Sequence, residues 1–354
     1  MSVLRKILIV QTAFIGDVVL TLPLVQVLKR QFPNSAIDMV VSPRASGLLE
    51  NHPDIRKVHI YDKRGSDSGI VGILAMMQRI RHERYDLAIV PHRSFRSALL
   101  VWLSRIPRRV SFNRSAGWFL YTSTVSYDPS LHEVERNLRL LKAIGVTWRG
   151  RELPDLYPDE EDRVRVGKLL VEHEIGNAER LVAVAPGSAW NTKRWPKERY
   201  VRLIQLLIHE DYEIVLVGGQ EDAGLCEEIV RDVRMKEVYS AAGKLTLLQS
   251  AELLRRAKVL ITNDTAPMHI AVAMRTPVIA IFGPTVPEFG FAPYGDHDRI
   301  VQVKGLSCRP CSIHGTKTCP IGTFECMLDI DVLQVYEHVR DLLHTPGVGA
   351  RRTV

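Results

Sequence analysis

A polar cluster lies between two apolar runs in the last third of the chain. The runs 259–261 and 277–282 are typical of buried strands, and turn residues and a helical spacing separate them. We therefore predict the strand, turn, helix and strand of a parallel sheet. Asn263, Asp264 and Thr265 then fall at the carboxyl end of the first strand, where open α/β sheets bind ligands.

Small residues at this turn favour an anion. Thr265 and Ala266 would let a ligand approach the amides that open the next helix, and such amides bind phosphates. A phosphate-bearing ligand is the first interpretation. The alternative is that Asp264 or Thr265 only caps the helix.

A second loop, 185–196, brings two cations to a similar position. It follows a predicted strand, passes through Gly187 and Ser188, and reaches Lys193 and Arg194 just before a helix. Flexible polar backbone followed by two cations suits a diphosphate. Loop cations are usually only solvated, but the tryptophans on either side of this pair favour a folded loop.

Asp17 follows the first predicted strand, next to Gly16, which permits a tight turn. Asp17 is either a helix cap or a catalytic base at the carboxyl end of that strand. No GxGxxG motif lies beside it, so a dinucleotide fingerprint is absent. In the second half, Gln220 or Glu221 ends a strand and could bind a ribose hydroxyl, although a plain turn explains these residues equally well.

Four of the five cysteines gather in the segment 305–328. In a cytoplasmic chain this grouping favours a structural zinc or iron site over disulfides, with reduced thiols as the other alternative. Such a closed site has no open position for catalysis. The four residues are Cys308, Cys311, Cys319 and Cys326.

Strands alternate with helices in both halves, which predicts two doubly wound parallel sheets. We expect domains at 1–158 and 159–344, a cleft between them as the ligand site, and a disordered tail at 345–354. The charged, proline-containing segment 147–159 is the predicted linker. Expected strands are 6–10, 36–41, 57–61, 86–90, 109–111, 181–185, 213–217 and one near 238; expected helices are 17–31, 70–84, 94–104, 133–144, 196–209, 222–233, 246–257 and 331–343.

Composition points to a cytoplasmic protein with an acidic partner. The 354 residues carry a net charge of +7, and arginines are concentrated in the first half. No apolar run approaches the roughly 20 residues that span a bilayer, and the N-terminus lacks the features of a signal peptide. Nucleic acid is disfavoured because no binding motif or interleaved aromatic residues accompany the arginines. A nucleotide or an anionic membrane surface fits better.

Together these motifs resemble glycosyltransferase family 9, the ADP-heptose:lipopolysaccharide heptosyltransferases, over nearly the whole chain. The cysteine-containing ending is more similar to heptosyltransferase II than to heptosyltransferase I. The resemblance implies a GT-B fold of two Rossmann-like domains, the first binding the acceptor and the second the nucleotide sugar. The matching stretches are FIGDVVLTLP, PGSAWNTKRWP, LVGGQED, ITNDTAPMHIAVAMRTPVIAIFGPT and TCPIGTFECMLDI.

The resemblance also implies roles for individual residues. Asp17 resembles the catalytic base of an inverting transfer from ADP-heptose to the inner core attached to lipid A, with no catalytic metal. Arg93 and Arg96 are the candidates for the acceptor's acidic groups. The basic first half would hold the enzyme at the anionic inner face of the cytoplasmic membrane. The donor-binding residues would be Ser188, Lys193, Arg194, Gln220, Asp264, Thr265, Ala266 and His269.

Other functions stay open from the sequence. Within the family, heptosyltransferase I or a protein heptosyltransferase differs only in the acceptor. In other classes, a nucleotide-sugar epimerase would use the same scaffold without an acceptor, and a non-enzymatic nucleotide-binding regulator would not need Asp17.

Overall fold

The computed structural model describes residues 4–175 and 180–345. Within them the chain forms two compact units, unit 1 and unit 2, which divide between residues 157 and 158. The predicted tail, apart from Thr345, lies outside the described residues. No helix in the described ranges is long and apolar enough to cross a membrane.

Unit 1 is built on a parallel sheet with the order β3-β2-β1-β4-β5-β6. The order reverses between β1 and β4, because β1 pairs with both β2 and β4. Its strands are β1 (Lys6–Val10), β2 (Ala36–Val41), β3 (Lys57–Ile60), β4 (Leu87–Ile89), β5 (Arg108–Phe112) and β6 (Ser123–Val125). Its helices are α1 (Ile15–Val19), α2 (Leu22–Gln31), α3 (Pro43–Ser46), α4 (Gly69–Glu83), α5 (Phe95–Leu103) and α6 (Glu133–Arg139), with the short 3-10 helices η1 (Gly47–Leu49), η2 (Trp118–Leu120) and η3 (Leu140–Ile144).

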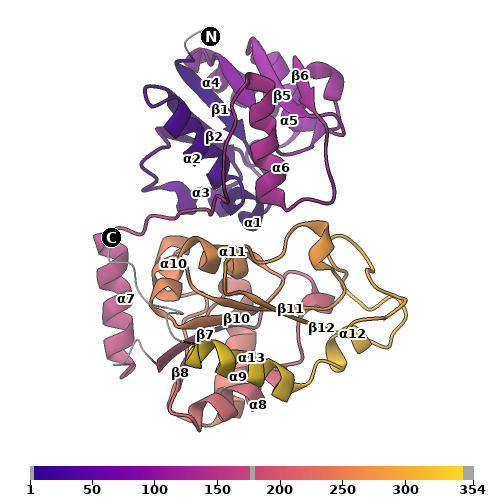
Figure 1. Ribbon diagram of the computed structural model, residues 1–354. Helices are drawn as coiled ribbons and strands as arrows, with labels where there is room; N and C mark the ends of the chain where they lie inside the picture. The colour runs from indigo at the N-terminus through magenta and orange to yellow at the C-terminus, as the bar shows by residue number, and fades with distance from the viewer. Residues whose placement is uncertain (1–3, 176–179, 346–354) are drawn as a thin grey trace. The chain divides into compact units, whose positions relative to one another are not determined.

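Unit 2 repeats this topology with the order β12-β11-β10-β7-β8-β9, reversing between β7 and β10. Figure 1 shows α10 and α11 on one face of this sheet and α8, α9 and α13 on the other. Its strands are β7 (Leu181–Ala185), β8 (Glu213–Leu216), β9 (Val238–Ser240), β10 (Val259–Asn263), β11 (Val278–Phe282) and β12 (Arg299–Gln302). Its helices are α7 (Glu160–Glu172), α8 (Lys197–Ile208), α9 (Ala223–Val233), α10 (Leu247–Arg256), α11 (Ala266–Ala273), α12 (Glu325–Leu328) and α13 (Val332–His344), with the 3-10 helices η5 (Asn191–Lys193), η6 (Gln220–Asp222) and η7 (Pro287–Phe289).

Helices cover both faces of the sheet, which explains why the central strands have continuous apolar sequences. Every residue of β7, β10 and β11 is buried, as expected for parallel strands covered on both sides. The predicted α/β class with two Rossmann-like sheets is confirmed.

Several element predictions need correction. The helix predicted over 17–31 is broken into α1 and α2, because Pro23 has no amide to donate and belongs in the first turn of a new helix. Helix α7 and the strands β6 and β12 were not predicted. Strands β6 and β12 are short edge strands with little apolar signal.

Candidate functional site

In unit 2, Asn263 joins the loop after β7 to the end of β10. Its side-chain oxygen accepts hydrogen bonds from the Trp195 amide at 3.1 Å and the Tyr200 hydroxyl at 3.0 Å. Its side-chain nitrogen donates to the Pro186 carbonyl at 2.8 Å. Asn263 is fully buried, so it stabilises the loop after β7 and is not available to contact a ligand itself.

Lys193 and Asp264 form an ion pair at the point where the sheet order reverses. Lys193 Nζ lies 2.5 Å from Asp264 Oδ2 and donates to the Asp264 backbone carbonyl at 3.0 Å. The Thr285 hydroxyl, after β11, donates to the same carboxylate at 2.7 Å. Both charged side chains are about one-tenth exposed. The cation is therefore fixed in place within a side chain that keeps some exposure.

Helix α11 begins beside this pair without a side-chain cap. The Thr265 hydroxyl lies 3.3 Å from both the Thr262 hydroxyl and the Asn263 carbonyl, and makes no capping bond. The simple capping interpretation of Thr265 is thus wrong. The amide of Ala266 opens the helix and can donate to an anion. Pro267 has no N–H, and the Met268 amide donates to the Thr265 carbonyl at 3.1 Å.

His269 faces the same charges from inside α11. Burial lowers its pKa to about 4, although Asp264 acts in the opposite direction. The ring is therefore neutral near neutral pH, and its Nδ1 atom is buried without a hydrogen-bond partner in the described structure. A buried polar atom of this kind needs a partner, which a ligand could supply.

The other predicted donor residues take different places. Arg194 donates from Nε and Nη2 to the Ser188 carbonyl at 2.9 and 2.7 Å, so its guanidinium closes its own loop. The Ser188 hydroxyl accepts from the Trp190 amide at 3.2 Å. Gln220 is exposed at the start of η6. Lys193 is thus the better placed of the two predicted cations.

Sequence reasoning missed Asp222, which lies between two glycines. A Cβ added to Gly187 would come 2.0 Å from an Asp222 carboxylate oxygen, and one added to Gly218 would come 2.7 Å from the Asp222 Cβ. Burial raises the pKa of Asp222. The loops after β7 and β8 therefore approach so closely that only glycine fits, and the GGxxD spacing was the available signal.

The cysteine segment is fastened to the Lys193 loop by hydrogen bonds. The Thr192 amide and hydroxyl donate to the Thr316 carbonyl at 3.2 and 2.8 Å, and the Thr316 amide donates to the Thr192 hydroxyl at 2.8 Å. The Cys311 amide donates to the Pro284 carbonyl at 3.0 Å. The segment therefore positions the residues on each side of the Lys193–Asp264 pair.

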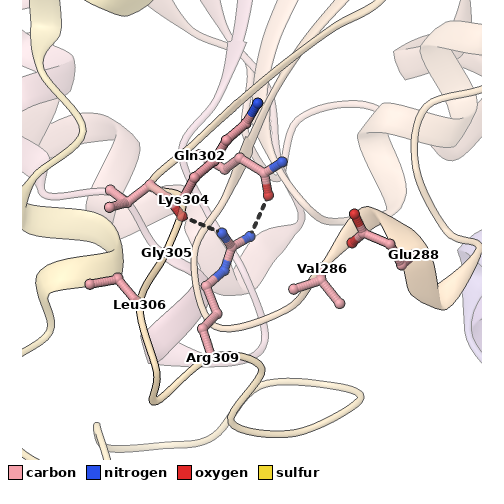
Figure 2. Close-up of a pocket in the computed structure, with 8 residues that line it drawn as sticks. Val286, Glu288, Gln302, Lys304, Gly305, Leu306 and Arg309 are labelled. Atoms are coloured by element: carbon pink, nitrogen blue, oxygen red, sulfur yellow. Dashed lines mark hydrogen bonds between the residues drawn. The ribbon is translucent and has the colours of Figure 1, made fainter.

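Arg309 adds a second attachment. Its guanidinium donates to the Gln302 side-chain oxygen at 2.7 Å, a bond that can be followed in Figure 2, on the wall of a pocket of about 230 Å³. It also donates to the Val303 carbonyl at 2.6 Å. Two more bonds run to the Thr285 carbonyl. With its donors occupied in this way, Arg309 acts as a structural tie between the segment and β12.

The structure gives the predicted Cys₄ metal site no support. Across residues 4–175 and 180–345, no three His, Cys, Asp or Glu side chains are arranged to hold a metal ion. The cysteines are free thiols, and the four of this segment lie within electrostatic reach of one another. Cys326 packs in the apolar core of unit 2, the Cys311 thiol donates to the Cys308 carbonyl, and backbone amides of the 321–324 turn surround Cys319.

In unit 1, Asp17 lies in α1 beyond the end of β1. Its Oδ2 atom accepts a hydrogen bond from the Phe14 amide at 3.1 Å. Asp17 therefore does help to cap the start of α1, as one of the two interpretations of the sequence proposed. Removal from bulk water raises the pKa of Asp17 to about 6, while the Phe14 amide and the charge of Arg93 act to lower it. The side chain keeps partial exposure. A partly exposed carboxylate with raised proton affinity can serve as a general base.

A second buried carboxylate, Glu133, was not predicted. It begins α6 and accepts Arg136 Nη1 at 2.9 Å. Burial and the nearby charge of Asp17 raise the pKa of Glu133 to about 7. Arg93 and Arg136 both lie over the Tyr127 ring, at 4.2 and 5.1 Å from its centroid. Arg93 is therefore held within electrostatic reach of both carboxylates.

Arg96 and Lys63 differ in their freedom to bind a ligand. Arg96 donates to the Tyr61 hydroxyl and the Asp67 carbonyl, both at 2.6 Å, so it fastens the loop before α4. The Lys63 ammonium group makes no hydrogen bond or ion pair within the described residues, and its Nζ lies 5.9 Å from the centroid of the Tyr61 ring. Burial, followed by the Arg96 charge, lowers the pKa of Lys63 to about 8. An unpaired, partly buried ammonium group is suited to an anionic ligand.

Comparison with known proteins places these features in a family. The family model for glycosyltransferase family 9 (heptosyltransferase) matches residues 73–321, more than half of the chain. The chain is also 27% identical to lipopolysaccharide heptosyltransferase 2 of Salmonella typhimurium, over 97% of this chain and all of that protein.

Two solved structures have the same fold. The glycosyl transferase family 9 structure from Veillonella parvula matches with a TM-score of 0.85 at 26% identity, covering 96% of this chain and 97% of that one. The Escherichia coli ADP-heptose lps heptosyltransferase II structure matches with a TM-score of 0.78 at 24% identity, covering 96% and 98%. These matches confirm the predicted GT-B fold class.

Proposed function

This chain belongs to glycosyltransferase family 9, and from that premise we propose that it transfers heptose from ADP-heptose to the lipopolysaccharide inner core. The chain is a glycosyltransferase enzyme, and the full-length similarity to heptosyltransferase 2 favours that activity over heptosyltransferase I or a protein heptosyltransferase. The observation that carries the proposal is the fixed Lys193–Asp264 pair beside the uncapped start of α11.

The donor's diphosphate would bind at this pair. Lys193, the Ala266 amide and the positive end of the α11 dipole would stabilise the negative charge that develops on ADP as it leaves. Asp264 holds the lysine in place, and the unpaired Nδ1 of neutral His269 would accept a hydrogen bond from a donor hydroxyl. Ser188, Arg194, Thr265, Ala266 and Gln220 complete the proposed donor site, with Arg194 acting through the shape of its loop.

Asp17 would act as the general base. It would take the proton from an acceptor hydroxyl as that oxygen attacks the anomeric carbon, and the bond to ADP would break on the opposite face, with inversion. The raised pKa leaves Asp17 ionised near neutral pH while increasing its affinity for the proton. In this mechanism fixed cations and amides stabilise the leaving group in place of a divalent ion. A structural ion on the cysteines forms no part of the proposal.

The acceptor would bind at the carboxyl edge of the unit 1 sheet. Lys63 and Arg93 would contact its acidic groups, and Arg96 would keep the Lys63 loop in position. The reaction would take place at the cytoplasmic face of the membrane that carries the acceptor.

The decisive experiment incubates the purified full chain with ADP-heptose and defined inner-core acceptors of different lengths. We expect ADP release that requires an acceptor, and a product heavier by one heptose whose anomeric configuration is inverted by NMR. Conversion of the nucleotide sugar without any acceptor would instead assign an epimerase. Tight ADP binding without turnover would indicate a regulator.

A further inference from the structure

Helices α4 and α5 and the short helix η2 expose an unusual amount of apolar surface. Val71 is 80% exposed, Ile70 is 76% exposed and Phe119 is 65% exposed. We call this surface of unit 1 the α4–α5 face. Its large apolar side chains are Ile70, Val71, Leu74, Phe95, Trp102, Trp118 and Phe119.

These side chains lie on neighbouring elements. Helix α4 packs against α5, and α5 packs against η2. Phe95 and Trp102 are seven residues apart and so share one side of α5, and a Cβ added to Gly117, just before η2, would come 2.9 Å from the Phe95 ring. On α4 the opposite side is already buried in the core through Ile73, Met76 and Ile80. The exposed residues therefore form an outer surface that the fold itself does not use.

The same segment has a net charge of about +7, equal to that of the whole chain. Residues 69–125 contain nine arginines and two acids, Glu83 and Asp86. Both acids are engaged elsewhere: Glu83 pairs with Lys6, Arg56 and Lys57, and Asp86 accepts the amides of Arg5 and Lys6. The arginine charge on this face is thus not neutralised by the chain.

Three of these arginines line one pocket. Arg81, Arg84 and Arg105 surround a space of about 420 Å³ at the carboxyl ends of α4 and α5. All three are exposed, and none forms an ion pair within the described ranges. A pocket with three guanidinium groups and no carboxylate suits a phosphate group.

We propose that the α4–α5 face docks onto a phospholipid bilayer that contains anionic headgroups. Aromatic and aliphatic side chains would enter the interfacial region while the arginines bind lipid phosphates, the combination that holds proteins on a membrane surface. The high positive charge favours an anionic bilayer over a second copy of this basic chain, which would be repelled. Helices α4 and α5 begin at the sheet edge that carries Lys63 and Arg93, so docking would bring a lipid-linked acceptor toward that edge.

Sedimentation with lipid vesicles tests this inference, which deepens the proposed function but does not require transfer to be measured. The full chain is mixed with vesicles of phosphatidylcholine alone or mixed with phosphatidylglycerol. We expect binding only to the mixed vesicles. The charge variant Arg81→Gln, Arg84→Gln, Arg105→Gln should bind on the order of 100-fold more weakly, and the apolar variant Val71→Ser, Trp118→Ser, Phe119→Ser at least about tenfold more weakly.

Matched controls lie on unit 2. Two control variants should bind as the wild type does. The charge control is Arg202→Gln, Arg231→Gln, Arg234→Gln, and the apolar control is Val164→Ser, Val171→Ser, Leu333→Ser. Equal binding by test and control variants, or no binding by the wild type, would overturn the inference. Loss of a dimer in the apolar variant, seen by size exclusion, would assign the face to self-association instead. Transfer of heptose to a short water-soluble acceptor should be unchanged in both test variants. If the wild type shows no such transfer, that result counts against the proposed function and not against membrane docking.

Discussion

Lys193 Nζ lies 2.5 Å from Asp264 Oδ2, so the cation that follows β7 is held by the turn that follows β10. The two residues are far apart in sequence and meet because β7 and β10 are neighbours at the reversal of strand order. The pair gives the proposed diphosphate site a fixed positive charge, and the predictions below begin from it.

Replacing Lys193 by Ala should reduce kcat/KM for transfer by about 10²- to 10³-fold, because the charge on departing ADP loses its fixed partner. Lys193→Arg should recover only part of this, since the guanidinium does not fit the ammonium position. Initial rates of ADP release measure both variants. Lys197→Ala removes a nearby lysine that pairs with Glu228 and Asp232 on the surface, and it should retain wild-type rates; equal losses in both alanine variants would contradict the assignment.

Asp17→Asn should lower kcat by about 10²- to 10⁴-fold, as expected on removing a general base, and leave ADP affinity unchanged. Calorimetric titration of ADP separates the two effects. The matched variant Asp331→Asn changes a helix cap on α13 that asparagine can also supply, so its kcat should stay at the wild-type value. Full activity in Asp17→Asn would exclude Asp17 as the base.

The pH profile of transfer should show an acidic limb near pH 6. The base must be ionised to accept the proton, and the pKa of Asp17 is raised to about 6, so kcat/KM should fall as the pH drops through that value. A profile that stays flat down to the ordinary aspartate pKa would place the proton on another group.

Asp17→Asn should also stabilise unit 1 near neutral pH. Folding raises the pKa of the Asp17 carboxyl from 3.8 to about 6, so the folded state binds this proton more tightly than the unfolded state does. The resulting contribution to stability is complete below pH 3.8 and is lost as the pH rises through about 6. At neutral pH the folded chain therefore holds an unfavourable, partly buried charge, which asparagine lacks. We expect a gain of about 1 kcal/mol, which is discounted because the carboxylate is partly exposed. Denaturant midpoints should show the gain near neutral pH and none below the unfolded pKa; a gain independent of pH would have another cause.

Thr192→Val combined with Thr316→Val should lower kcat/KM by roughly 10- to 100-fold, because the cysteine segment then no longer fixes the Lys193 loop and small displacements are costly. Thr318→Val, in the same segment, changes a hydroxyl that is exposed and makes no hydrogen bond in the described structure, and its rates should match the wild type. An unchanged double variant would show that the segment does not position Lys193.

Lys63→Gln should raise KM for the acceptor severalfold without changing KM for ADP-heptose. The change removes the contact between the unpaired ammonium group and an acidic group of the acceptor, whereas the donor's diphosphate would bind in unit 2. Steady-state kinetics with each substrate varied in turn measure the two constants. Lys142→Gln removes a lysine from η3, away from the loop before α4, and should alter neither constant.

The sequence by itself determined the two parallel sheets, since continuous apolar strands and amphipathic helices are local patterns. It also predicted a shared site for Asp264 and Lys193, because both lie after such strands and the carboxyl ends of parallel strands share one edge, and the structure brings the two side chains together. It did not show that the guanidinium groups of Arg194 and Arg96, predicted as ligand contacts, donate to backbone carbonyls.

Only the tertiary structure decided which polar groups are paired. The Asp264 carboxylate partners, the unpaired Nδ1 of His269, the position of Glu133 near Asp17 and the unpaired state of Lys63 all depend on contacts between segments distant in sequence. The same is true of the cysteines: their spacing suggested a metal, and folding brings the thiols within electrostatic reach of one another, but no three His, Cys, Asp or Glu side chains of the described residues are arranged to hold an ion. Residue type fixes which interactions a side chain is able to make, and folding fixes which partners come within reach.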